Sequence, residues 1–158
     1  MHDYGVGAGA ATAAIPALER EERRAIRMRR EPTHPPVAVE QLAREPGHEW
    51  LIDRIDAAEV VAVGVPTLLE AAMVLTARLG QDARPMIFAF LRRLEAAVVP
   101  FNEDHLNAAA TAFIRFGRGR HPAALNSGDR MSYAVASVAG MPLLFTGEDF
   151  RRTDIAQA

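Results

Sequence analysis

The sequence of 158 residues contains no cysteine, no lysine, few aromatic residues and no long apolar run. The absence of cysteine excludes disulfides, thiolate catalysis and cysteine-ligated zinc. No apolar run reaches the length of a membrane-spanning helix. The absence of lysine argues against a phosphoacceptor domain, which also gathers acids at parallel strand ends but needs a strand-borne lysine. Any chemistry must therefore come from other side chains.

The composition is that of a single soluble globular domain, with 49% hydrophobic and 24% charged residues. The formal net charge is −2, so any affinity for nucleic acid must come from a local patch. The apolar stretch at residues 5–18 lacks a basic leader and is poor in Leu, Ile and Val. We therefore expect no signal peptide there, and a cytoplasmic location is the default expectation.

The chain divides into two unequal parts. Residues 1–32 combine an Ala/Gly-rich opening with a run dense in both charges, which predicts an irregular or loosely attached extension. Residues 33–158 alternate helix and strand patterns, typical of an α/β fold with a central parallel sheet. We expect strands within residues 59–66, 97–101 and 141–147, and helices within residues 67–80, 84–97, 102–117 and 126–140.

Acidic residues follow or precede the predicted strands. Glu70 comes after the first of them, Glu148 and Asp149 come after the last, and Asp129 opens the helix before that last strand. Sites in parallel sheets form outside the carboxyl ends of strands. If these carboxylates converge, a hard cation such as Mg²⁺ or Mn²⁺ would relieve their repulsion. The alternative is that each acid merely stabilises a helix N-terminus.

Three segments resemble the PIN-domain ribonucleases, and closely the VapC-type toxins of toxin–antitoxin pairs. They are "LLEAAMVL", "RFGRGRHPAALNSGDRMSYAVA" and "PLLFTGEDFRRTDI", in a region of likeness running from about residue 36 to 155. The resemblance implies a three-layer α/β/α sandwich that cleaves RNA with Mg²⁺ or Mn²⁺. It also implies that Glu70, Asp129 and Asp149 are the catalytic and metal-binding acids.

Further residues have supporting roles in this interpretation. Ser132 lies one helical turn after Asp129 and could orient a water or phosphate, or simply pack near the sheet. Asn126 is expected to cap the helix, and Glu148 to substitute for or assist Asp149. The expected RNA-binding residues are Arg118, Arg120 and Arg130. Aromatic residues at helical spacing are expected in the core, among them Trp50, Phe88, Phe113 and Phe116.

The resemblance also implies partners. It predicts an RNA substrate, a cognate VapB-type antitoxin and a homodimer, with no membrane association. Neither the RNA target nor the antitoxin can be read from these residues.

The N-terminus departs from the family pattern. The family begins with a strand ending in Asp, a variable residue, Ser and Ala; the Asp should fall near His34, in "EPTHPPVAVE". The codons GAC GCA TCC GCC encode Asp-Ala-Ser-Ala, and the same bases read one position along encode Thr-His-Pro-Pro, the residues found at 33–36. One hypothesis is therefore that a frameshift has replaced the N-terminal strand and its Asp. Without that Asp we predict weak or absent nuclease activity. The alternative function is an impaired domain that only binds antitoxin or RNA.

Overall fold

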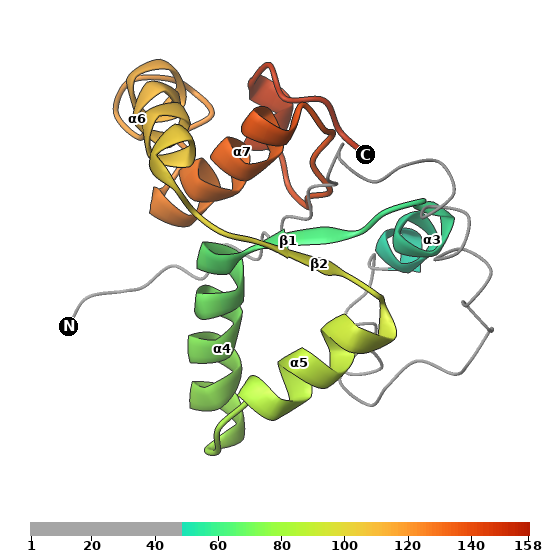
Figure 1. Cartoon of the computed structure of the whole chain (residues 1–158). Helices are drawn as coiled ribbons and strands as arrows, with labels where there is room; N and C mark the ends of the chain where they lie inside the picture. The colour runs from blue at the N-terminus through green and yellow to red at the C-terminus, as the bar shows by residue number, and fades with distance from the viewer. Residues whose placement is uncertain (1–48) are drawn as a thin grey trace.

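The fold of the described residues, 49–158 of the computed structural model, is built around two short parallel strands with helices on either side (Figure 1). The elements in chain order are α3 (Glu49–Ala57), β1 (Ala62–Gly64), α4 (Val65–Leu79), α5 (Arg84–Arg93), β2 (Ala97–Val99), α6 (Glu103–Phe116), α7 (Ser127–Ala139) and a 3₁₀ turn (Phe150–Arg152).

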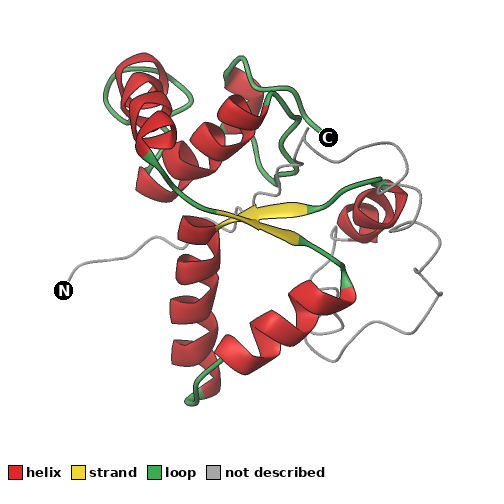
Figure 2. Ribbon diagram, viewed as in Figure 1, coloured by secondary structure: helices red, strands yellow, loops and turns green. Residues whose placement is uncertain are grey.

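Side chains of β1 alternate between two helical layers. β1 and β2 pair in parallel, with Val63 opposite Val98. Val63 packs with α4 and α5, whereas the backbone of Gly64 approaches Val135 of α7. Since successive strand residues point to opposite faces, α4 and α5 cover one face and α7 covers the other (Figure 2). The predicted three-layer α/β/α arrangement is confirmed.

Each layer has its own buried apolar cluster. Between the strands and α4 and α5, the buried residues are Ala83, Ile87 and Leu91. On the other side, α6, α7 and the C-terminal segment bury a larger set. Its members are Ala112, Phe116, Ala123, Leu125, Tyr133, Val135, Ala136, Leu143, Phe145 and Phe150. The larger core therefore supports the helix that begins near Asp129.

Local capping signals set the helix ends where the sequence predicts them. Asn102 caps α6 and Asn126 caps α7, each through a side-chain oxygen that accepts a backbone N–H three residues later. Gly80 and Gly140 directly follow α4 and α7 and cap their C-termini, both in the left-handed conformation. These predictions are confirmed.

The strands are shorter than predicted. The expected strand within residues 59–66 is reduced to Ala62–Gly64, and α4 begins at Val65, because Pro66 fits the first turn of a helix. In the expected strand within residues 141–147, Leu143, Leu144 and Phe145 are buried, and the bridge recorded with another residue of 49–158 is a parallel one between Leu143 and Gln157.

Residues 1–48 lie outside the described part of the structure. The predicted extension at 1–32, the start of the predicted domain at 33 and the departure from the family pattern near His34 all fall there. Within residues 49–158, no helix is both long enough and apolar enough to cross a membrane.

Candidate metal and RNA site

Asp129 occupies the first turn of α7 in a reciprocal cap. The Asn126 backbone N–H donates to Asp129 Oδ2 at 2.8 Å, and the Asp129 N–H donates to Asn126 Oδ1 at 3.0 Å. The predicted capping role of Asn126 is therefore confirmed, and Asp129 takes part in the same cap. A carboxylate has about four acceptor sites, so the cap leaves Asp129 able to accept a further ligand.

The electrostatic surroundings of Asp129 disfavour its charge. Burial raises its pKa above the ordinary value of 3.8, and the nearby Asp149 carboxylate raises it further. The hydrogen bond from Asn126 and the charges of Arg118 and Arg130 act in the opposite direction and lower it. A partly buried carboxylate beside a second one is a place where a cation would stabilise the ionised form.

Glu70 reaches the same end of α7 from the neighbouring helix. A Cβ atom added at Gly128 would lie 2.7 Å from Glu70 Oε2, so the Glu70 carboxylate rests against the backbone next to Asp129. Glu70 is itself exposed. One turn earlier on α4, Thr67 Oγ1 lies 3.2 Å from Ser132 Oγ, joining the two helices through a hydroxyl pair.

Ser132 is buried, with 5% of its surface exposed, and its hydroxyl is engaged with Thr67. This contact agrees with the packing alternative for Ser132 and adds Thr67, which the sequence analysis missed. Thr67 and Glu70 are three residues apart in α4 and therefore share a face, which is the signal that could have found Thr67.

Asp149 and Glu148 lie in the exposed turn after the last buried segment. Asp149 precedes the 3₁₀ turn and is close enough to Asp129 for their charges to interact. Glu148 instead forms an ion pair of 3.2 Å with Arg151. The geometry thus separates the two neighbours: Asp149 acts electrostatically on Asp129, and Glu148 is paired with an arginine.

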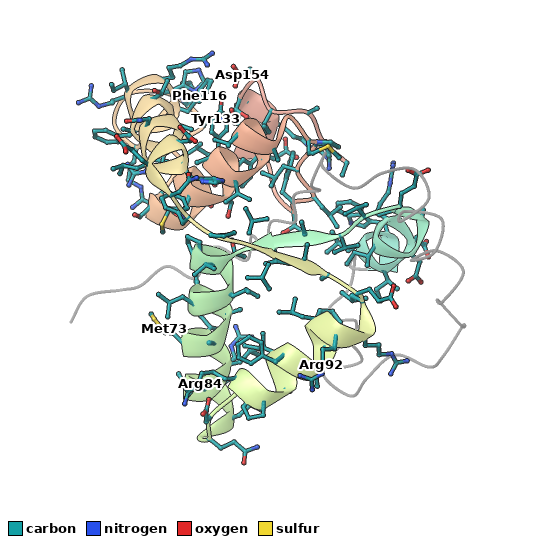
Figure 3. All side chains as sticks on the ribbon, in the orientation of Figure 1. Met73, Arg84, Arg92, Phe116, Tyr133 and Asp154 are labelled. Carbon is teal, nitrogen blue, oxygen red and sulfur yellow. The ribbon has the colours of Figure 1, made fainter. Side chains whose placement is uncertain are left out.

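A polar network anchors the segment that carries Asp149. Phe150 is buried beside Phe145, and the Tyr133 hydroxyl donates to Asp154 Oδ1 at 2.7 Å. Arg115 of α6 forms a 2.8 Å ion pair with the other Asp154 oxygen. Figure 3 shows Tyr133 and Asp154 close together, beside α6 and α7. The network ties the C-terminal segment to both helices.

The donor set suits a hard divalent cation. Glu70, Asp129 and Asp149 offer only carboxylate oxygens, the ligands that Mg²⁺ and Mn²⁺ prefer. Within residues 49–158, however, no three acidic or histidine side chains stand close enough to form a ready-made metal cluster. Glu70 and Asp149 are exposed and can rotate, whereas Asp129 is held by its cap. The chemistry of the donors therefore fits, with Asp129 as the fixed member.

The three predicted RNA-binding arginines lie around this site. Arg118 and Arg130 act on the charge of Asp129, and Arg120 and Arg130 each lie over the ring of Phe113.

The prediction that the aromatic residues are core residues is correct for Phe116 and wrong for others. Trp50, Phe88 and Phe113 are 36%, 51% and 39% exposed, because helical spacing alone does not show which face of a helix is covered.

Comparison with known proteins identifies the class to which this fold and site belong. A family model described as the PIN domain matches residues 36–156. The match covers most of the chain, so the chain belongs to the PIN-domain family.

Several curated relatives then narrow the identification. Ribonuclease VapC30 of Mycobacterium tuberculosis is 38% identical over 118 residues, covering 75% of this chain and 90% of the relative. Ribonuclease VapC of Mycolicibacterium smegmatis is 41% identical over 115 residues, covering 73% and 89%. Ribonuclease VapC36 of Mycobacterium tuberculosis is 43% identical over a shorter 93 residues. Within the PIN-domain family, the chain belongs to the VapC ribonucleases.

Proposed function

We propose that this protein is the toxin of a type II toxin–antitoxin pair, an endoribonuclease that cleaves RNA with Mg²⁺ or Mn²⁺. The observation that supports the proposal is that Glu70 lies against Gly128 and Asp149 acts electrostatically on Asp129, both at the start of α7, in a chain that belongs to the VapC ribonucleases. The raised pKa of Asp129 supports a site that is completed by a cation.

The acids would hold the metal, which supplies a water of lowered pKa and stabilises charge on the phosphoryl oxygens. Asp129, fixed by the Asn126 cap, serves as the anchoring ligand. Glu70 and Asp149 approach it from α4 and from the turn before Phe150. A carboxylate among them accepts the proton of the attacking water, so no side-chain nucleophile is needed.

The arginines would hold the RNA backbone beside the acids. Arg118 and Arg130 lie near enough to influence the charge of Asp129, so a phosphate bound by them would lie near the metal ligands. Because these contacts are with phosphate, binding is expected to weaken as salt concentration rises. Ser132 and Glu148 would have supporting roles, through Thr67 and Arg151 respectively.

The partners we propose follow from the family. A VapB-type antitoxin would neutralise the enzyme, RNA would be its substrate, and the protein would act in the cytoplasm as a homodimer. We propose that residues 33–158 form the ribonuclease domain and residues 1–32 an extension. The prediction of weak activity, based on the absent family Asp near His34, concerns residues outside 49–158 and stays a prediction.

Cleavage of RNA by the full chain tests the proposed function. Labelled RNA should be cut, at the weak rate expected without the family Asp near His34, when Mn²⁺ or Mg²⁺ is present, and should remain intact in excess EDTA. Asp129→Asn should lower the rate by about 100-fold or more, because it weakens the anchoring ligand. Asp104→Asn, the same substitution in the first turn of α6, is the matched control and should cut like the parent.

Two outcomes would contradict the proposal. Cleavage that persists unchanged in EDTA would remove the metal from the mechanism. RNA binding without any cleavage by the parent chain would instead support the alternative of an impaired domain that only binds its partners.

A further inference from the structure

Two arginines share one phenylalanine ring beside the proposed site. The guanidinium carbon of Arg120 lies 4.7 Å from the centroid of the Phe113 ring, and that of Arg130 lies 4.8 Å from the same centroid. Such distances are those of cation–π contacts, which restrict where each guanidinium can lie. The ring is 39% exposed, so the cluster stands at the surface.

Neither guanidinium of this cluster forms an ion pair with a carboxylate of the described residues. In the described part of the chain, Arg84, Arg115 and Arg151 form ion pairs with Asp82, Asp154 and Glu148. Arg120 and Arg130 have no ion pair there and are held by an uncharged ring instead. Two like charges kept close together, of which Arg130 also interacts with the carboxylate of Asp129, favour binding of an anion.

The backbone at the end of α6 makes this arrangement possible. A Cβ atom added at Gly117 would lie 2.6 Å from Cδ2 of Phe113 and 2.5 Å from its carbonyl oxygen. Glycine at 117 therefore lets the chain turn closely past the Phe113 ring and bring Arg120 over it. Arg130 arrives from the other side of the loop, directly after Asp129.

We propose that Phe113, Arg120 and Arg130 form a subsite for the phosphodiester backbone of single-stranded RNA, adjacent to the acids. This inference rests on the proposed function and assigns a role to Phe113, which holds the two guanidiniums in place without touching the reacting atoms. Arg130 connects the two regions, since its charge also acts on Asp129. RNA bound here would extend away from the scissile phosphate along the loop of residues 117–126.

Binding of a fluorescent single-stranded oligoribonucleotide tests the subsite. The full chain carrying Asp129→Asn is used in EDTA, so that the probe is not cut. Phe113→Leu should weaken binding about three- to tenfold, because both arginines lose their fixed orientation. Phe113→Tyr keeps the ring and should bind like the parent. Phe88→Leu removes an exposed phenylalanine on α5 and is the matched control.

The salt dependence of the same binding identifies the phosphate contacts. Arg120→Gln and Arg130→Gln should each reduce the slope of log K against log salt by about 0.7, the value for one phosphate contact on a single strand. Phe113→Leu should leave the slope unchanged, since both charges remain. Arg92→Gln on α5, which lies away from α6 and α7 (Figure 3), should change neither affinity nor slope.

Combining the variants tests the assigned role of Phe113. In a chain with both Arg120→Gln and Arg130→Gln, Phe113→Leu should cause no further loss of affinity. An equal loss in both backgrounds would mean that the ring contacts RNA directly, and would overturn the proposed holding role. Phe113→Leu that binds RNA as tightly as Phe88→Leu would also overturn it. Loss of binding to poly-glutamate with unchanged RNA affinity would assign the cluster to an acidic protein partner and overturn the RNA subsite.

Failure of the proposed subsite can be distinguished from failure of the proposed function. If the parent chain cleaves RNA but the Phe113 and arginine variants bind it normally, the subsite is wrong and the ribonuclease stands. If the parent neither binds nor cleaves RNA, the proposed function fails and the subsite fails with it.

Discussion

Asp129 combines two roles that place opposite demands on its charge. As the partner of Asn126 in a helix cap it accepts a backbone N–H, which favours the ionised form. Burial and the neighbouring Asp149 raise its pKa and make ionisation costly. In the metal-free protein, the folded state therefore holds a proton on Asp129 more tightly than the unfolded state does.

The raised pKa of Asp129 in the folded state determines how the stability of the protein depends on pH. Because the folded pKa lies above the ordinary 3.8, the free energy of unfolding falls as pH rises from 3.8 through the raised value. Asp129→Asn keeps an acceptor oxygen for the cap and has no proton to lose. In EDTA, the Tm of the variant minus the Tm of the parent should therefore increase from about pH 4 to about pH 8.

Thermal unfolding of both proteins across that range measures the difference. Asp104→Asn, an exposed position in the first turn of α6, controls for the loss of a charge at a helix start and should show no such increase. A difference that stays flat or decreases with pH for Asp129→Asn would contradict the assigned electrostatics.

Substitution of Gly128 should act by displacing the Glu70 side chain, and not by disturbing α7. An alanine Cβ at 128 would lie 2.7 Å from Glu70 Oε2, at the end of an exposed and flexible side chain, which can swing away. We expect Gly128→Ala to change the free energy of unfolding by no more than about 1 kcal/mol, in the stabilising direction, because alanine favours helix.

Gly128→Ala should lower the affinity for metal and not the stability of the fold. Displacing Glu70 should weaken Mn²⁺ affinity about tenfold in a calorimetric titration. Glu70→Gln should then add little in the Gly128→Ala background, because both changes remove the same contribution. Ser127→Ala, one residue earlier and exposed, is the control. Undiminished Mn²⁺ affinity in Gly128→Ala would argue that Glu70 is not a ligand.

At the scale of elements, the site depends on how closely β1 approaches α7. A Cβ at Gly64 would lie 2.8 Å from Cγ2 of Val135, a buried residue that cannot withdraw to solvent. Gly64→Ala should therefore destabilise the protein by about 1–3 kcal/mol, as overpacking of a core does.

A double-mutant cycle in chemical denaturation separates overpacking from other causes. Val135→Ala removes the clashing methyl group, so the double variant should be more stable than the sum of the two single changes predicts. Strictly additive losses would mean that the contact between β1 and α7 does not limit the side chain at residue 64.

Element identities could be predicted from local signals, whereas strand lengths could not. Asn102, Asn126 and Gly140 act within one or two turns of the helix ends that they define, so the sequence near them is sufficient. The extent of a strand depends on its partners. The segment at 141–147 has the apolar sequence of a buried strand, yet its described pairing is one bridge to Gln157.

At the scale of the whole molecule, the candidate site is formed by segments far apart in the sequence. Thr67 and Ser132 lie 65 residues apart and are in contact, and Glu70 rests against Gly128. The family resemblance identified Glu70, Asp129 and Asp149 as candidates. It gave neither the hydroxyl pair nor the exposure of Phe113, because these depend on how α4, α6 and α7 pack together.

The anchoring of the C-terminal segment is equally a property of the assembled fold. Asp154 joins Tyr133 of α7 and Arg115 of α6, and the ring of Phe116 lies against Tyr133. These contacts hold the segment that follows Asp149 against the helices of the larger core. The position of Asp149 near Asp129 therefore relies on packing that no local pattern in "GEDFRRTD" encodes.

The most direct test of the account is calorimetric titration of Mn²⁺ into the full chain and into its Asp129→Asn variant. If the acids at the start of α7 form the metal site, the parent chain binds Mn²⁺ and the variant binds at least about 10- to 100-fold more weakly. Equal binding by both proteins, or no binding by the parent, would contradict the assignment of the site to Asp129 and its neighbours.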